Sequence, residues 1–270
     1  MTKIIFLTAC VKPNGMAYTA LNDINTRKQH YIYALQWYLE NTSNKIVFVE
    51  NTNTNLSDGF TKWVIEGRLE FLTFNGNNYG IHLGKGYGEA RILQYGLKHS
   101  KFLKRDDDVF VKISGRYLCR NITKILDKYD SINTVYANIG KDDWGGNIAD
   151  SSFVMGPVKF WKDYFLPQKE KLNDSKHFHF EHLLYESIYH WKKSGMKHKE
   201  FWTLPQMEGV SGTSGLKFIS KKNRDLKSSL LYFLHKVGYR GYLNPFYKGN
   251  PDFEIDKLNN NKNMYINQNY

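Results

Sequence analysis

The segment from Arg105 to Tyr117 places acidic, basic and glycine residues close together. It begins with three aspartates, and the side chains of Asp106 and Asp108 point to the same side of an extended backbone, because successive residues alternate. Two carboxylates arranged in this way can share one divalent cation, such as Mn²⁺ or Mg²⁺. Asp106 and Asp108 are therefore candidate metal ligands.

The same segment continues as Lys-Ile-Ser-Gly-Arg-Tyr, from Lys112 to Tyr117. Arg116 can pair two oxygens of one phosphate, and Lys112 adds a compact positive charge. Gly115 has no side chain and allows the backbone to approach a ligand closely. Lys112, Gly115 and Arg116 are therefore candidates for binding a diphosphate.

Two strand registers are compatible with this segment. If Phe102 to Asp106 forms the strand, the acidic residues lie at its carboxyl end and suit a metal. If Val109 to Ser114 forms it, the acidic residues lie at the other end and the basic residues occupy the carboxyl end. We favour the second register because it places apolar side chains on one face of the strand, namely those of Val109, Val111 and Ile113.

The elements that position these residues begin with a strand, a helix and a second strand. Apolar runs over residues 3–9 and 45–51 are typical of buried parallel strands, and the helical spacing of apolar residues from Arg27 to Glu40 predicts the connecting helix. A β-α-β order favours a parallel sheet that binds ligands at the carboxyl ends of its strands. From this first part of the chain we select four candidate donor-binding residues: Thr8, Lys12, Arg27 and Glu50.

A third strand is expected over residues 69–74, followed by a glycine-rich loop from Gly84 to Glu89 and a helix over Ala90, Leu93 and Leu97. A loop at a helix N-terminus can present backbone amides and a lysine to a phosphate. A plain loop with a helix cap is the alternative. This loop adds Lys85, Gly88 and Glu89 to the donor-binding candidates.

The second half of the chain carries two candidate catalytic carboxylates. Glu181 opens a helix expected over residues 180–192, and its aromatic neighbours would raise its pKa toward the range of a general base. Asp150 precedes an apolar strand-like segment, within the stretch from Trp144 to Met155. The alternatives are favourable placement of Glu181 near a helix N-terminus and a turn role for Asp150.

The C-terminal region from residue 221 to 248 predicts a basic amphipathic helix, since residues 221–240 contain six basic residues and one acidic residue. Such a helix could lie on an anionic membrane surface or pack against the protein. The asparagine-rich tail, residues 249–270, is expected to be disordered.

The net charge, the cysteine content and the length of the apolar runs indicate which classes of partner and location are compatible with this protein. The chain has 270 residues, a formal charge of +12 and a pI near 9.4, which suits an acidic partner: nucleic acid, a membrane surface or a phosphorylated small molecule. The two cysteines, Cys10 and Cys119, indicate neither a disulfide framework nor a zinc site. No apolar run approaches the ~18 residues of a membrane span, so we expect a cytoplasmic protein, soluble or peripheral at the inner face of the membrane.

Together these segments resemble bacterial glycosyltransferases of the GT-A type that serve capsule and O-antigen polysaccharide (lipopolysaccharide) synthesis. The resemblance extends over about residues 3 to 220, and its most specific part is the Lys-Ile-Ser-Gly-Arg-Tyr motif. The other segments that carry it are Gly84 to Ala90, Phe180 to Glu186 and Glu208 to Gly212.

The resemblance implies an α/β fold, a GT-A-like (Rossmann-like) mixed sheet flanked by helices, in a single domain over residues 1–220 with a C-terminal helical extension. Residues 1–130 would bind a nucleotide sugar and residues 131–220 an acceptor, with Glu208 and Ser211 as acceptor-binding candidates. The expected reaction moves a sugar to a hydroxyl of a glycan or lipid-linked glycan. Asp106 and Asp108 match the metal motif of such enzymes by letters. An inverting enzyme would need a base such as Glu181 and a retaining one would not, and the sequence does not decide between them.

Two other classes are compatible with parts of the sequence. One is a nucleic-acid-binding or nucleic-acid-processing protein that uses the basic charge and paired carboxylates. Against it, the basic residues gather near the C-terminus and no known nucleic-acid module occurs, so no nucleic-acid partner is expected. The other is a scaffold that keeps the fold and has lost its chemistry.

Overall fold

The computed structural model describes residues 3–13, 15–16, 19–130, 132–142, 144–215 and 217–218. The predicted amphipathic helix, residues 221–248, and the tail, residues 249–270, lie outside the described residues.

The central sheet has seven strands in the order β10-β6-β9-β4-β1-β2-β3. Strand β9 runs antiparallel to both of its neighbours, whereas the other pairs in the sheet are parallel. The prediction of a mixed α/β sheet flanked by helices is confirmed. The bounds are β1 (Ile4–Ala9), β2 (Ile46–Glu50), β3 (Leu69–Thr73), β4 (Val109–Ser114), β6 (Thr134–Tyr136), β9 (Phe153–Pro157) and β10 (Lys197–Lys199).

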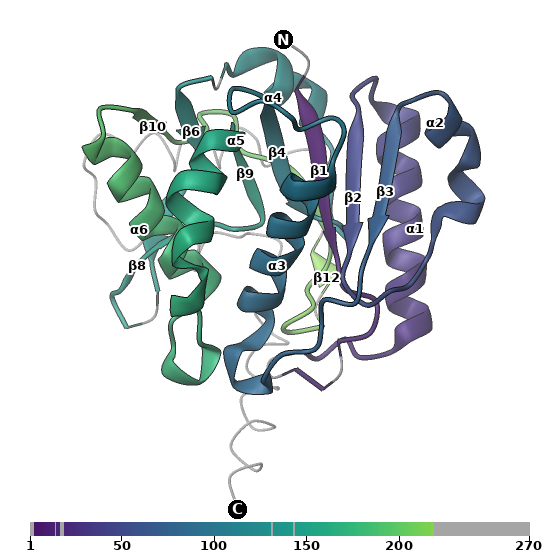
Figure 1. Ribbon diagram of the computed structural model, residues 1–270, viewed down its shortest axis with the longest axis horizontal. Coiled ribbons are helices and arrows are strands. Elements are labelled where there is room, and N and C mark those ends of the chain that lie inside the picture. The colour runs from purple at the N-terminus through teal and green to yellow at the C-terminus, as the bar shows by residue number, and fades with distance from the viewer. Residues whose placement is uncertain are drawn as a thin grey trace, which may run out of the picture.

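Helices cover the two faces of this sheet. Figure 1 shows α3 crossing one face in front of β1 and β4, with α5 and α6 beside it and α1 behind β2 and β3. The helices are α1 (Ile24–Asn41), α2 (Thr61–Ile65), α3 (Gly84–His99), α4 (Ile122–Lys128), α5 (Val158–Phe160) and α6 (Phe180–Lys193). A π-helical turn over Trp161–Phe165 and short 3₁₀ turns over Ser57–Phe60, Ile81–Leu83, Leu166–Lys171 and Asp174–Lys176 complete them.

Strand alternation divides the core into two layers. On β4, Val109, Val111 and Ile113 pack with α1 and α4, as predicted, and Phe110 packs on the side of α3 and α6. Lys112 has the same parity as Phe110, so its side chain also faces α3 and α6. Lys112 therefore lies in the core layer between the sheet and helices α3 and α6.

The structure adopts the second register of the opening segment, since β4 is Val109–Ser114. The glycine-rich segment differs from the expected loop, because Gly84 to Glu89 already forms the first turns of α3. Glycine is required there for space: a Cβ on Gly84, whose φ is 74°, would lie 1.9 Å from the Asp174 carboxylate. The start of α3 is therefore packed closely against the 3₁₀ turn that carries Asp174.

Two small sheets lie beside the central one. Strands β5 (Leu118–Cys119), β11 (Met207–Val210) and β12 (Lys217–Phe218) form the first, and the hairpin β7 (Ile139–Lys141) with β8 (Asn147–Ala149) forms the second. Strand β11 overlaps the segment from Glu208 to Gly212, which carries part of the resemblance. Among the residues that the structure describes, no helix is both long and apolar enough to cross a membrane.

Candidate functional site

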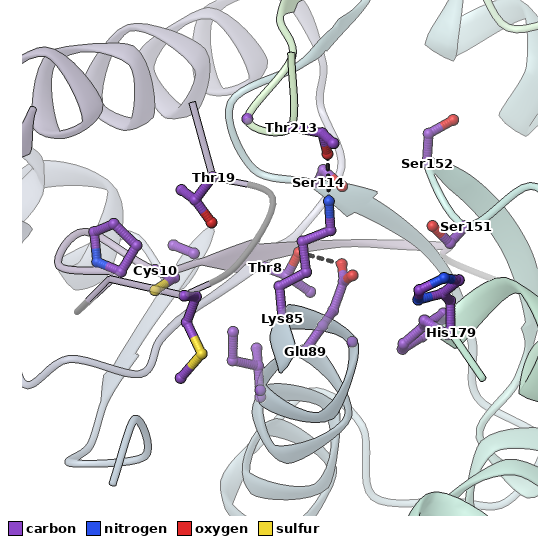
Figure 2. A pocket seen from close by; sticks show the side chains of 18 of the residues that line it. Thr8, Cys10, Thr19, Lys85, Glu89, Ser114, Ser151, Ser152, His179 and Thr213 are labelled. Atoms are coloured by element: carbon purple, nitrogen blue, oxygen red, sulfur yellow. Dashed lines mark hydrogen bonds between the residues drawn. The ribbon is translucent and has the colours of Figure 1, made fainter. Parts of the chain in front are cut away.

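A cavity of about 550 Å³ lies at the carboxyl ends of β1 and β4. Residues 8–10 of β1 and the loop after it, and residues 114–117 after β4, form part of its wall, and the first turns of α3 and α6 form another part. Figure 2 shows Lys85 and Glu89 of α3 between Thr8 and Cys10 on one side and Ser151 and His179 on the other. This is the sheet edge at which α/β proteins bind ligands.

Glu89 anchors the wall of the cavity to the sheet beneath it. Its Oε1 accepts a hydrogen bond of 2.9 Å from the Thr8 hydroxyl and lies 2.5 Å from the Lys112 Nζ. Lys112 also donates to the Ser151 carbonyl and lies 5.0 Å from the ring centroid of Phe180. One buried ammonium therefore connects β1, β4, α3 and α6.

Lys85 stands in the middle of the cavity. Its ammonium donates to the Thr213 hydroxyl, and its backbone N–H donates to the buried Asp174 carboxylate over 3.2 Å. Burial lowers the pKa of Lys85, and the nearby carboxylates of Glu181, Asp174 and Glu89 oppose that shift. A cation held in such surroundings is a strong partner for an incoming anion.

Arg116 lies at the end of β4 that the motif predicted. Its Nη1 donates to the Val210 carbonyl over 3.0 Å, and its guanidinium carbon lies 5.8 Å from the ring centroids of Tyr31 and Tyr117. The Gly115 N–H donates to the Thr8 carbonyl over 2.8 Å, which joins this turn to β1. The two aromatic rings thus lie beside a guanidinium that lines the cavity.

The opposite wall carries the two candidate catalytic carboxylates. The Ser151 hydroxyl donates to Glu181 Oε1 over 2.6 Å, and Asp150 accepts from the Ser152 N–H over 2.8 Å. Loss of hydration raises the pKa of Asp150, although the hydrogen bonds from Ser152 oppose this, and the charge of Glu181 adds to the rise. A carboxyl with a raised pKa suits proton transfer near neutral pH.

Nine of the candidates from the sequence line this one cavity. They are distributed along the chain from β1 to α6, so only the fold brings them together. They are Thr8, Arg27, Lys85, Gly88, Glu89, Gly115, Arg116, Asp150 and Glu181.

Three donor-binding candidates have other surroundings than expected. Lys112 is fully buried, so it supports Glu89 from below and does not reach a ligand directly. Glu50 is also fully buried, and its carboxylate accepts backbone N–H bonds from Val11, Thr52 and Thr54. Lys12 lies outside the cavity wall.

Arg27 lines the cavity, but its guanidinium donates hydrogen bonds to backbone carbonyl groups. Nε donates to the Cys10 carbonyl over 2.9 Å and Nη1 donates to the Leu21 carbonyl over 3.0 Å. Arg27 therefore clamps the segment between β1 and α1. This clamp holds Cys10 in the wall, and burial raises the pKa of the Cys10 thiol to about 11.

The acceptor-binding candidates Glu208 and Ser211 do not line the cavity. Glu208 Oε2 accepts from Arg120 Nε over 2.7 Å, and Ser211 Oγ accepts from the Ser214 N–H over 3.2 Å. Their neighbours Gly212 and Thr213 do line it. The segment is thus beside the cavity, but the residues that reach it are the next ones along the chain.

Asp106 and Asp108 lie at the amino end of β4, away from the cavity wall. Asp106 pairs with Lys162 over 2.7 Å, and Asp108 accepts from the backbone N–H groups of Lys104 and Arg105. The described part of the chain contains no group of three histidine, cysteine or acidic residues suited to a metal. These two carboxylates therefore do not fit a metal that would act in this cavity.

Several cavity residues had no clear sequence signal. Tyr31 reads as an ordinary apolar helix position and Asp174 lies in a polar turn, so only the fold gives them a role. Tyr117 ends the Lys-Ile-Ser-Gly-Arg-Tyr motif, but no role was assigned to it from the sequence. Trp144 did carry a signal, since an indole beside two glycines in a polar turn has few ways to become buried.

No family model matches the chain, and no curated protein matches it either. Among solved structures, HddC from Yersinia pseudotuberculosis is 15% identical with a TM-score of 0.44, over 86% of this chain and 100% of that one. The inositol-1-phosphate CTP transferase from T. maritima is 12% identical with a TM-score of 0.41, over 74% and 85%. A cytidylyltransferase from Leptospira borgpetersenii is 12% identical with a TM-score of 0.39, over 100% and 98%. Similarity at this level does not assign a function.

Proposed function

We propose that this protein is a glycosyltransferase that moves a sugar from a nucleotide-sugar donor to a hydroxyl of a glycan or lipid-linked glycan. The observation that carries the proposal is the composition of one cavity. Arg116 and Lys85 supply positive charge at the strand ends and the first turn of α3, and Asp150 and Glu181 supply carboxylates on the opposite wall. The cavity volume, about 550 Å³, falls within the usual range for small-molecule sites.

The cations suit the diphosphate of the donor. A guanidinium can pair two phosphate oxygens, and the ammonium of Lys85, in the first turn of α3, adds a second positive charge beside them. As the sugar leaves, negative charge grows on the diphosphate, and Arg116 and Lys85 would stabilise that charge. No step of this proposal depends on a resident metal.

The carboxylates of Asp150 and Glu181 could take the proton that the acceptor hydroxyl loses in the reaction. The acceptor hydroxyl oxygen bonds to the anomeric carbon, and the bond from that carbon to the diphosphate oxygen breaks. The nucleoside diphosphate leaves with the bonding electrons, and in an inverting reaction the hydroxyl proton passes to Glu181 or Asp150. The hydrogen bond from Ser151 orients Glu181 for this role.

The acceptor class is proposed from the resemblance to enzymes of capsule and O-antigen synthesis. A lipid-linked acceptor would place the enzyme at the inner face of the membrane. Co-sedimentation of the full chain with vesicles containing anionic lipid tests that location, and binding equal to that of neutral vesicles would argue against it.

A thermal-shift screen of nucleotide sugars and nucleoside diphosphates tests donor binding, since a ligand of the native state raises the melting temperature. We expect a rise with at least one nucleoside diphosphate in the wild-type protein and a smaller rise, at the same concentration, in Arg116→Ala. Repeating the screen with Mg²⁺, Mn²⁺ and EDTA tests metal dependence. A rise with oligonucleotides alone would refute the proposed function.

A further inference from the structure

Trp144 is the most exposed tryptophan described, with 76% of its surface accessible, and it also lines the cavity. A large exposed indole at the mouth of a cavity is unusual for a side chain with only a packing role. Trp202 is also exposed, at 54%, but lies outside the cavity wall. The position of Trp144 therefore points to a ligand.

The turn that carries Trp144 is held rigidly. Asp142 Oδ1 accepts hydrogen bonds from the Trp144 N–H over 3.0 Å and from the Gly146 N–H over 2.7 Å. Asp142 Oδ2 lies 2.9 Å from His182 Nε2 on α6. The hydrogen bond from His182 lowers the pKa of Asp142, which favours the charged carboxylate that accepts these three hydrogen bonds.

The connection matters because His182 follows Glu181 directly in α6. The backbone of Trp144 is thereby joined, through Asp142, to the same helical turn that carries a candidate catalytic carboxylate. A ligand that stacks on Trp144 would be held at a constant position relative to Glu181.

A second ring extends the surface. The imidazole of His177 lies 5.4 Å from the indole, centroid to centroid. The backbone of His177 is left-handed, with a φ of 55°, and its N–H donates to the Asp174 carbonyl over 3.2 Å. A non-glycine residue in that conformation carries strain that its neighbours must offset. The turn from Asp174 to His177 thus holds the imidazole beside the indole, with the two ring planes tilted by 56°.

We propose that Trp144 and His177 form a stacking platform for a pyranose ring of the acceptor glycan. The proposal rests on the proposed function and adds the subsite that binds the acceptor. The axial C–H groups of a pyranose make one face slightly positive and apolar, which complements the negative face of an indole. The hydroxyls at the ring edge remain available to Asp150, Ser151 and Glu181.

The location favours the acceptor over the nucleoside of the donor. His179, two residues after His177, lies with Ser151 and Ser152 on one side of Lys85 and Glu89, and Cys10 and Thr19 lie on the other side (Figure 2). Arg116 contacts Tyr31 of α1, which belongs to the latter side. A donor diphosphate between Arg116 and Lys85 leaves the Trp144 side for the acceptor.

Saturation-transfer NMR with methyl glycosides of glucose, galactose, mannose and N-acetylglucosamine, in the presence of a saturating nucleoside diphosphate, tests the platform. We expect a signal from the axial-proton face of at least one glycoside, and about tenfold weaker binding in Trp144→Ala. Trp144→Phe should keep part of the binding, and Trp202→Ala, the matched exposed tryptophan, should keep all of it. Melting temperatures of the variants report on their folding.

Nucleoside diphosphate binding, measured separately by thermal shift, keeps this proposal distinct from the proposed function. If wild-type protein binds no nucleoside diphosphate, the proposed function fails. If it binds one but no glycoside gives a signal, or Trp144→Ala binds glycosides as wild type does, the platform is refuted. Loss of nucleotide binding in Trp144→Ala with glycoside binding intact would also refute it, because the indole would then serve the donor.

Discussion

Lys112 and Glu89 form an ion pair beneath the cavity, with Nζ and Oε1 2.5 Å apart. The side chain of Lys112 is entirely buried, whereas 21% of the side-chain surface of Glu89 remains accessible. Glu89 also has the Thr8 hydroxyl as a partner. The two charged groups of this pair therefore differ in burial and in other partners. Removing one charge should change the stability of the protein by a different amount from removing the other.

Glu89→Gln should destabilise the protein more than Lys112→Met. The first change leaves a buried ammonium without a counter-ion, which costs roughly 3–5 kcal/mol, and the second leaves a carboxylate that keeps Thr8 and some solvent. Chemical denaturation of both variants measures the free energies of unfolding. The double variant Glu89→Gln/Lys112→Met should be less destabilised than the sum of the two, and strict additivity would contradict a direct pair.

Arg116→Ala should weaken nucleoside diphosphate binding about tenfold to hundredfold, because a hydrogen bond to a charged group contributes roughly 1.5–3 kcal/mol. Isothermal titration measures the affinity. Arg120→Ala provides the control, since Arg120 lies close along the chain but pairs with Glu208 outside the cavity wall. Equal losses in the two variants would mean that general positive charge, and not Arg116, attracts the ligand.

Gly115→Ala should destabilise the fold by roughly 1–3 kcal/mol, because the new Cβ would lie 2.7 Å from the Thr8 carbonyl oxygen, which belongs to rigid backbone. The change would also disturb the hydrogen bond that joins the ends of β1 and β4, so nucleotide affinity should fall with it. Gly59→Ala is the matched control, since nothing lies within 4 Å of its added Cβ. A melting temperature of Gly115→Ala equal to that of Gly59→Ala would contradict the close approach.

The pair of His179 and Asp174 should make stability depend on pH. The hydrogen bond to Asp174 raises the pKa of His179 above its ordinary 6.5, although partial burial opposes this. A raised folded-state pKa means that the stabilisation is complete below pH 6.5 and is lost as pH rises through the folded value. The wild-type protein should therefore have a higher free energy of unfolding than His179→Gln. We expect this difference to be largest near about pH 6 and to fall toward about pH 8. A difference that stays constant between these two pH values would contradict the pair.

Asp150→Asn should alter the pH profile of sugar transfer if Asp150 takes the acceptor proton. Loss of hydration raises the pKa of this carboxyl above 3.8, so the rising limb of the profile in wild type should have its midpoint above that value. Donor hydrolysis and transfer, each measured across pH in wild type, Asp150→Asn and Glu181→Gln, separate the two carboxylates. A rising limb that persists in Asp150→Asn and disappears in Glu181→Gln would assign the proton to Glu181.

The local pattern of residues determined much of the fold. Apolar runs and helical spacing placed β1, α1, β2, β3, β4 and α6 close to their observed bounds, because continuous burial of a central strand and burial of every third to fourth side chain of a helix are local requirements. The chemistry of the turn after β4 was also local, so Gly115 and Arg116 could be selected from the motif alone. The start of α3 was misjudged, because the space that its glycines provide is filled by Asp174, Phe180 and Tyr79 from other segments.

The tertiary structure decided which charged residues line the cavity and which support the fold. Lys112 and Glu50 have the residue types of ligand-binding groups, yet both are buried, because the parity of β4 and the hydrogen-bond needs of the loop after β2 direct them inward. Asp106 and Asp108 match a metal motif by letters, but the register of β4 puts them at the opposite end of the strand from the cavity. Residue types and spacing are properties of the sequence. Which side of a buried strand meets which helix depends on contacts between distant segments, and that relationship separates Arg116 in the cavity wall from Lys112 beneath it.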